Sequence, residues 1–80
     1  MTHETLWSVI YNELAENLPT HAINTWFEPI SPVALIDNEL VLEVPNQFFF
    51  EWIESHYKQN MNVVVSKSET PNLKFRFIVS

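Results

Sequence analysis

The sequence contains no glycine, and this absence restricts the fold and the function of the chain more than any other feature. Glycine adopts left-handed backbone conformations without steric cost and lets the backbone approach a phosphate closely. A Walker A loop, a dinucleotide-binding fingerprint and a GXXG nucleic-acid clamp each require glycines at fixed positions. The chain therefore carries none of these loops, and a self-contained nucleotide enzyme is excluded.

The rest of the composition fits one small domain without thiol chemistry. Eighty residues correspond to a single domain, and the lack of cysteine excludes disulfides and thiolate zinc sites. A domain of this size buries only about 60% of its unfolded surface. Because 46% of the residues are hydrophobic and 14% are aromatic, and aromatic side chains bury a large area each, the chain can still form a core.

The charge balance limits the possible partners. Ten Asp and Glu residues against four Lys and Arg give a net charge of −6, whereas DNA affinity comes largely from basic side chains that release counterions from phosphates. Strong duplex binding is therefore not expected. The first residues, MTHETLWSVI, include an early glutamate and no long apolar run, so they do not resemble a signal peptide. No stretch approaches the roughly 20 apolar residues of a membrane span, and we expect a cytoplasmic protein.

Hydrophobic periodicity predicts two helices in the first third of the chain. Between Thr5 and Leu18 the apolar residues fall within an arc of roughly 140° at about 100° per residue, which indicates an amphipathic helix that Pro19 closes. These residues are Leu6, Trp7, Ile10, Tyr11, Leu14 and Leu18. Trp7 lies inside the arc, so a core role is at least as well supported as an exposed one.

In the second predicted helix, Thr20 is the expected N-cap. Ile23, Trp26 and Phe27 have the i, i+3, i+4 spacing of a core face, and Pro29 ends the helix at Glu28. We therefore expect Trp26 to pack in the core.

The middle of the chain predicts a β-hairpin. Val33–Ile36 and Glu39–Val44 are separated by Asp37 and Asn38, two residue types that tolerate the positive φ angles of a tight turn. Leu40, Leu42 and Val44 share one strand face, which we expect to be buried, while the opposite face is mostly solvated. A last strand from Leu73 to Val79 points Lys74 and Arg76 to the face opposite its aromatic residues.

The third predicted helix runs from Gln47 to about Tyr57, with Asn46 as its N-cap. Its helical phase places Ile53 at the core face, Trp52 at the fringe and Phe48 roughly 140° away from the centre of that face. We expect Phe48 to be exposed and to form an aromatic flank with Trp52, its i+4 neighbour; the alternative is that the preceding segment or the second helix covers it. A further helical turn or two over 60–65 is only weakly indicated, because three valines disfavour a helix.

These elements follow the order α-α-β-β-α-β, a three-stranded sheet with helices packed on it, which defines an α+β domain. No residue pattern indicates catalysis. His3, His21 and His56 lack metal-ligand spacing, and neighbours on a helix such as Ser55 and His56 point about 100° apart. Glu51 and Glu54 are interpreted as a solvated face rather than as a metal site.

Basic residues cluster late in the sequence. Lys74 and Arg76 lie on one strand face, and with aromatic stacking they could contact a few phosphates of single-stranded nucleic acid. The interpretation that we favour for the chain alone is ordinary solubilising charge on an outer strand face.

Several segments together resemble the N-terminal domain (domain I) of the DnaA family of bacterial chromosomal replication initiators. They are Leu6-Trp7, Leu18-Pro19, Thr25-Trp26-Phe27-Glu28-Pro29-Ile30, the run from Asn38 to Phe48, Glu51-Trp52-Ile53 and Tyr57. The resemblance extends over essentially all 80 residues. It implies a KH-like α-α-β-β-α-β fold without a GXXG loop, and it implies that residues 1–80 form one domain of a larger initiator.

The resemblance also implies a function without catalysis in this domain. In the family, ATP binds to a following AAA+ domain and origin DNA to a C-terminal helix-turn-helix domain, so no cofactor is expected in residues 1–80. Domain I promotes self-association of the initiator, recruits the replicative helicase and docks initiation regulators, and some members bind single-stranded DNA weakly.

Individual positions correspond to functional positions of the family. Leu6 and Trp7 match the first-helix region implicated in self-association. The matches for helicase and regulator contacts are Thr25, Asn46 and Phe48, with Trp52 beside Phe48, and Ala22 stands where some relatives carry an acidic partner-binding residue. The leading hypothesis is therefore a protein-interaction module, and the alternative is a KH-like module that binds single-stranded nucleic acid weakly, through Lys74 and Arg76.

Overall fold

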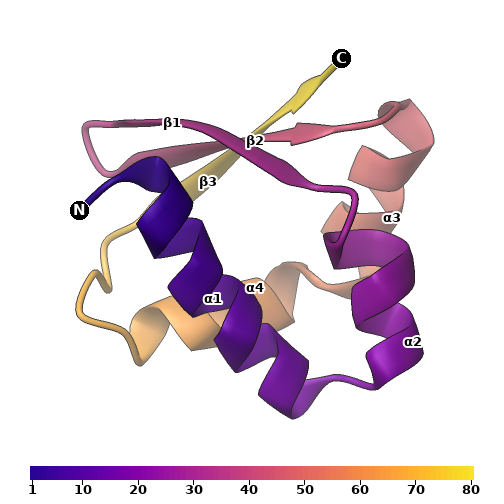
Figure 1. Cartoon of the computed structure of the whole chain (residues 1–80), viewed down its shortest axis with the longest axis horizontal. Helices are drawn as coiled ribbons and strands as arrows, with labels where there is room; N and C mark the ends of the chain where they lie inside the picture. The colour runs from indigo at the N-terminus through magenta and orange to yellow at the C-terminus, as the bar shows by residue number, and fades with distance from the viewer.

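The computed structural model describes all 80 residues. Its helices lie on one side of a three-stranded sheet (Figure 1). The elements are α1 (His3–Asn17), α2 (Thr20–Ala22), a π-helical turn η1 (Ile23–Phe27), β1 (Ser31–Ile36), β2 (Glu39–Val44), α3 (Gln47–His56), α4 (Lys58–Ser66) and β3 (Lys74–Val79). The predicted α+β class and the order α-α-β-β-α-β are confirmed, with α4 inserted between α3 and β3.

Residues next to its two ends determine where helix α1 begins and ends. The Thr2 hydroxyl accepts a hydrogen bond from the Thr5 backbone N–H at 3.1 Å and so caps the first turn. At the other end Leu18 is extended and precedes Pro19, which cannot continue the helix. The predicted apolar arc faces the core through Leu6, Trp7, Ile10 and Leu14.

The second helix differs from the prediction at its first residue. Pro19, not Thr20, occupies the N-cap position, and the Pro19 carbonyl accepts from the N–H groups of Ala22 and Ile23. Proline suits this position because its fixed φ matches the extended cap and it has no N–H to leave unpaired. The helix then widens into η1, where the Glu28 N–H donates to the Ile23 carbonyl at 2.9 Å, an i→i+5 bond.

The predicted hairpin is confirmed, including its turn. Asp37 and Asn38 both have positive φ, 50° and 65°, as a type I′ turn requires at its two central positions. Strands β1 and β2 pair antiparallel from Ile36↔Glu39 outward, with a bulge between Pro32 and Ala34. Asp and Asn therefore take the left-handed positions that glycine occupies in other chains.

Strand β2 lies at the centre of the sheet, between β1 and β3. Strand β3 runs parallel to β2, with Glu39 opposite Lys74 and Val44 opposite Val79. A parallel pair needs a long crossover connection, which α3 and α4 supply. Helix α3 thereby contacts β2 and β3, and α4 packs against α1 and α3 on the same side of the sheet.

The core lies between that inner face and the helices. Leu40, Leu42 and Val44 are fully buried, as predicted. The expectation that the opposite face of β2 is mostly solvated is wrong for Val41, which is also buried. Val41 lies between Ala34 of β1 and Arg76 of β3. Because β2 is the central strand, residues of both neighbouring strands cover the Val41 side chain.

Helix α4 is longer than its sequence indicated. Its apolar residues Met61, Val64 and Val65 are buried in the core. Burial of an apolar face stabilises a helix more than the modest propensity penalty of valine destabilises it. None of the helices combines the length and apolar composition needed to span a bilayer.

Candidate functional site

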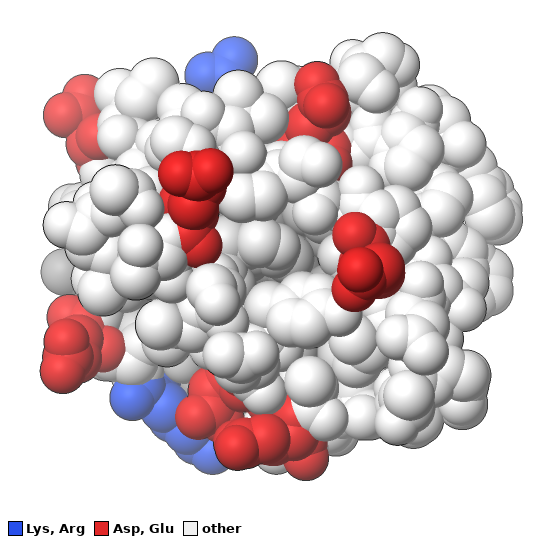
Figure 2. All heavy atoms as spheres, viewed as in Figure 1, with Lys and Arg blue, Asp and Glu red and all other residues white.

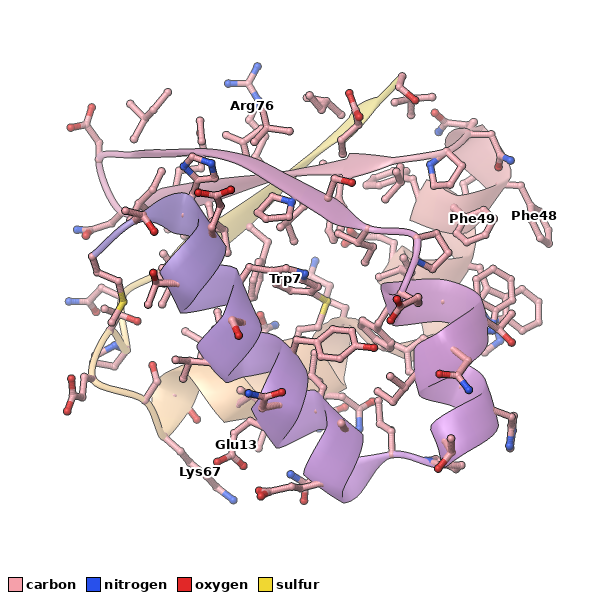
Figure 3. All side chains as sticks on the ribbon, viewed as in Figure 1. Trp7, Glu13, Phe48, Phe49, Lys67 and Arg76 are labelled. Atoms are coloured by element: carbon pink, nitrogen blue, oxygen red, sulfur yellow. The ribbon has the colours of Figure 1, made fainter.

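The first turn of α3 presents an exposed aromatic side chain. The Asn46 side-chain oxygen accepts a hydrogen bond from the Phe49 N–H at 3.0 Å, which fixes the start of the helix as predicted. In this phase Phe48 is 59% exposed and projects away from the domain beyond Phe49 (Figure 3). The prediction of an exposed Phe48 is confirmed, and neither the preceding segment nor the second helix covers it.

Phe48 belongs to an aromatic cluster built by two elements. Trp26 from η1 stacks on Trp52 from α3, with ring centroids 4.9 Å apart and an interplanar angle of 9°. The Phe48 ring lies 6.0 Å from Trp26 and 5.9 Å from Trp52. We call Trp26, Phe48 and Trp52 the aromatic surface.

The position of Trp26 corrects the sequence interpretation. Trp26 is only partly buried, at the edge of the core, whereas Phe27 and Ile23 from the same turn are buried. The wider π-helical turn rotates Trp26 away from the Ile23 and Phe27 side. Trp52 is also partly buried. It packs against Trp26 rather than directly against the hydrophobic core.

His56 extends the stack, a role that sequence analysis did not assign. Its ring lies 4.1 Å from the Trp52 ring at an angle of 14°, and its Nδ1 is 3.1 Å from the Trp52 carbonyl oxygen. The i, i+4 spacing of Trp52 and His56 on one helix is the signal that could have indicated this contact.

One polar atom of the aromatic surface has no partner. The Trp52 indole Nε1 is buried and makes no hydrogen bond. A buried donor without an acceptor is unfavourable by about 1–3 kcal/mol.

One edge of the molecule near the aromatic surface lacks charged side chains on the side that is visible in Figure 2. The edge of the molecule formed by α2 and α3, at the right of the view, carries no Lys, Arg, Asp or Glu there. Thr25 and Asn46, the other residues predicted for partner contacts, are exposed and adjoin Trp26 and Phe48 in the chain. An apolar centre with a polar rim is typical of protein-binding surfaces.

Three other predicted site residues are not on the surface. Leu6 is 3% exposed, Trp7 is 6% exposed and Ala22 is 3% exposed. Trp7 lies between α1 and the rest of the domain (Figure 3), with its ring 6.2 Å from that of Tyr11. A direct contact of these three side chains with a partner is therefore not supported. For Leu6 and Trp7 this burial agrees with the apolar arc that periodicity predicted, which faces the core.

A hydrogen bond fastens α1 to the end of η1. The Tyr11 hydroxyl donates to the Glu28 carboxylate over 2.6 Å. This hydrogen bond, together with burial and the negative charge of Glu28, raises the pKa of Tyr11 above its ordinary value of 10.0.

Two ion pairs, Glu54–Lys58 and Glu39–Arg76, lie elsewhere on the surface. Glu54 lies 3.1 Å from Lys58, whereas Glu51 accepts a long hydrogen bond from Gln47 at 3.4 Å, so the two glutamates have different partners. No group of three His, Cys, Asp or Glu side chains is arranged to hold a metal ion. Lys74 and Arg76 are exposed on the outer face of β3, and Arg76 lies 3.8 Å from Glu39.

Comparison with known proteins shows the family of the chain. The family model described as "DnaA N-terminal domain" matches residues 4–67. The chain is 38% identical over 76 residues to the chromosomal replication initiator protein DnaA of Flavobacterium psychrophilum, covering 95% of this chain and 16% of that protein. The corresponding protein of Chlorobaculum tepidum is 37% identical over 76 residues, covering 95% and 15%.

The DnaA protein of Thermus thermophilus is 35% identical over 57 residues, which cover 71% of this chain and 13% of that protein. The chain thus spans less than a fifth of the length of the curated relatives that it matches. The family model covers most of the chain, and the aromatic surface lies within the matched residues. The chain therefore belongs to the DnaA N-terminal domain family, a domain of chromosomal replication initiators.

Proposed function

We propose that this domain is a protein-docking module of a replication initiator and that the aromatic surface binds the replicative helicase and initiation regulators. The observation that carries the proposal is Phe48, a large aromatic side chain that is 59% exposed and rests on two tryptophans. Leaving such a ring in water loses the free energy that burial would provide. Aromatic residues at the centre of an interface commonly supply most of its binding energy.

The pairing of Trp26 with Trp52 prepares this surface for binding. Two stacked indole rings from different elements hold each other in place, so a partner would not need to order them. A surface that is ordered before binding loses less conformational entropy on association.

Self-association, the second activity implied by the family, would use exposed side chains of α1 rather than Leu6 and Trp7. Val9 on α1 and Val63 on α4 are exposed and line an open groove between these two helices. A second copy of the domain could bury both valines. In this proposal Trp7 supports the surface by holding α1 in place.

The docking proposal is tested by measuring the affinity of the chain for the replicative helicase of the same organism, by titration calorimetry. Phe48→Ala is expected to weaken binding by about 2 kcal/mol, or about 30-fold, as for a central interface aromatic. Ile36→Ala is the matched control, because Ile36 is 58% exposed and lies in the hairpin. The control variant should bind like the original chain.

Asn46 requires a different substitution because it caps α3. Asn46→Asp keeps a side-chain oxygen for the Phe49 N–H while removing the exposed amide group, so a loss of affinity in this variant would reflect a partner contact. If Phe48→Ala is folded and binds the helicase and the regulators unchanged, the proposed docking role of the aromatic surface is wrong.

The alternative function, weak binding of single-stranded nucleic acid, has less support. Arg76 and Lys58 each lie beside a glutamate, and Lys67 is at the end of α4, on another element from Lys74. No basic surface brings the four cations together.

A further inference from the structure

Strand β3 has an unpaired edge. In its parallel pairing with β2, Lys74 donates to the Asn38 carbonyl at 2.9 Å and Ser80 donates to the Val44 carbonyl at 3.2 Å. Backbone groups alternate in direction along a strand, so Lys74, Arg76 and Ile78 direct their backbone groups toward β2. The N–H and C=O groups of Phe75, Phe77 and Val79 therefore point away from the sheet, and none of them makes a hydrogen bond outside the ladder.

The other edge of the sheet is protected in ways that β3 is not. Strand β1 contains Pro32, which has no N–H, and a bulge follows it, two features that discourage pairing with a further strand. Strand β3 has neither a proline nor a bulge. An open regular edge is a template for an added strand.

Apolar side chains and a groove adjoin this open edge. Phe75 and Phe77 are only partly buried on the helix side of β3, and with Ile53 of α3 and Met61 of α4 they line a groove between the strand and these helices. An added strand directs alternate side chains to this side, so apolar residues at those positions would enter the groove.

The opposite side of β3 favours acidic residues. Lys74 and Arg76, half of the positively charged residues of a chain with net charge −6, both project from it. On β2, Glu39 lies directly opposite Lys74 and close to Arg76. A strand added on the open side with acidic residues would repeat this complementarity, since opposite charges on neighbouring strands attract.

We propose that the open edge of β3 binds an extended peptide segment in which acidic and apolar residues alternate. The backbone of Phe75, Phe77 and Val79 would pair with the segment, the groove would take its apolar side chains, and Lys74 and Arg76 would face its carboxylates. This binding surface is separate from the aromatic surface and goes beyond the proposed docking function. The side of α3 that faces β3 is marked by the contact of Phe50 with Phe77, and it is opposite the side that carries Phe48 and Trp52.

The test uses the ¹⁵N-labelled chain and two synthetic blocked peptides, SEVELEVS and its lysine counterpart SKVKLKVS. Hydrogen exchange measured by NMR is expected to slow at least about tenfold at the amides of Phe75, Phe77 and Val79 when the acidic peptide saturates the chain. The acidic peptide should bind about tenfold more tightly than the lysine peptide, because attractive cross-strand charge pairs replace repulsive ones.

Two substitutions and their controls make the result specific. Arg76→Glu should reverse the preference between the peptides, whereas Lys67→Glu, the same charge change at the C-cap of α4, should not. Val79→Pro removes an outward N–H without breaking a bond to β2 and should weaken binding of the acidic peptide at least threefold. Phe48→Ala should leave it unchanged.

Several outcomes would overturn the proposal. They are unchanged exchange at the three edge amides, equal affinity for the two peptides, and concentration-dependent protection of the edge without peptide, which would identify a second copy as the occupant. Binding of a single-stranded oligonucleotide at Lys74 and Arg76, without binding of the acidic peptide, would also contradict it and would assign this face to nucleic acid.

Discussion

Tyr11 and Trp7 lie one turn apart on the same side of α1, with their rings in contact. The Tyr11 hydroxyl reaches the Glu28 carboxylate, and this bond stabilises the protonated phenol. Because the pKa of Tyr11 is raised in the folded chain, the stabilisation is fully present below the ordinary tyrosine pKa of about 10. It is lost as the pH rises through the raised value.

A pH titration followed by tyrosine absorbance and NMR checks this assignment. Glu28→Gln should lower the pKa of Tyr11 toward the ordinary value, because the carboxylate charge and its acceptor strength are removed. Tyr11→Phe should reduce the free energy of unfolding by about 0.5 kcal/mol at pH 8, the low end for a hydrogen bond because this one is partly exposed. An unchanged Tyr11 titration in Glu28→Gln would show that the bond does not form in solution.

At the scale of elements, the hairpin turn shows how a chain without glycine makes a tight reversal. Asp37 and Asn38 both occupy the left-handed region, where short polar side chains are tolerated better than other side chains. The turn fixes the register of β1 against β2, and thus the burial of Leu40, Leu42 and Val44.

Substitutions at Asn38 test this conformation. Asn38→Val should reduce the free energy of unfolding by about 1–2 kcal/mol, because a β-branched side chain is sterically disfavoured in the left-handed region that Asn tolerates. Asn38→Gly should be neutral or stabilising by about 0.5 kcal/mol, since Asp-Gly is a preferred type I′ pair. Urea denaturation measures both changes, and equal stability of the Val and Gly variants would contradict the turn geometry.

For the whole molecule, substitutions on the two sides of α1 should have different effects. A change on the buried side should lower the stability of the domain, and a change on the exposed side should weaken self-association. Trp7 is part of the core, so Trp7→Ala should destabilise the domain by about 3–5 kcal/mol. That is a large part of the 5–15 kcal/mol typical of small proteins. Thermal unfolding followed by circular dichroism measures this loss.

Val9 provides the matched substitution on the exposed side of the same helix. Val9→Asp should leave the unfolding temperature within a few degrees of the original and should weaken self-association in sedimentation equilibrium, because a charge replaces an apolar contact in the groove. If Val9→Asp associates like the original chain, the groove between α1 and α4 is not the self-association surface.

The sequence by itself determined the features that depend on short-range chemistry. The order of the predicted elements, the Asn46 cap, the Asp37-Asn38 turn and the exposure of Phe48 all follow from neighbouring residues within one or two turns, and each is confirmed. Helical phase is fixed locally, so the side of α3 on which Phe48 lies could be predicted before its partners were known.

Only the tertiary structure decided which elements meet. The stacking of Trp26 on Trp52, the burial of Val41 and the completion of α4 each depend on contacts between residues that are distant in the chain or on neighbouring strands. The open edge of β3 likewise results from the strand order β1-β2-β3. Periodicity gives the apolar side of an element but not the element that covers it, because that choice depends on the free energy of packing the whole chain.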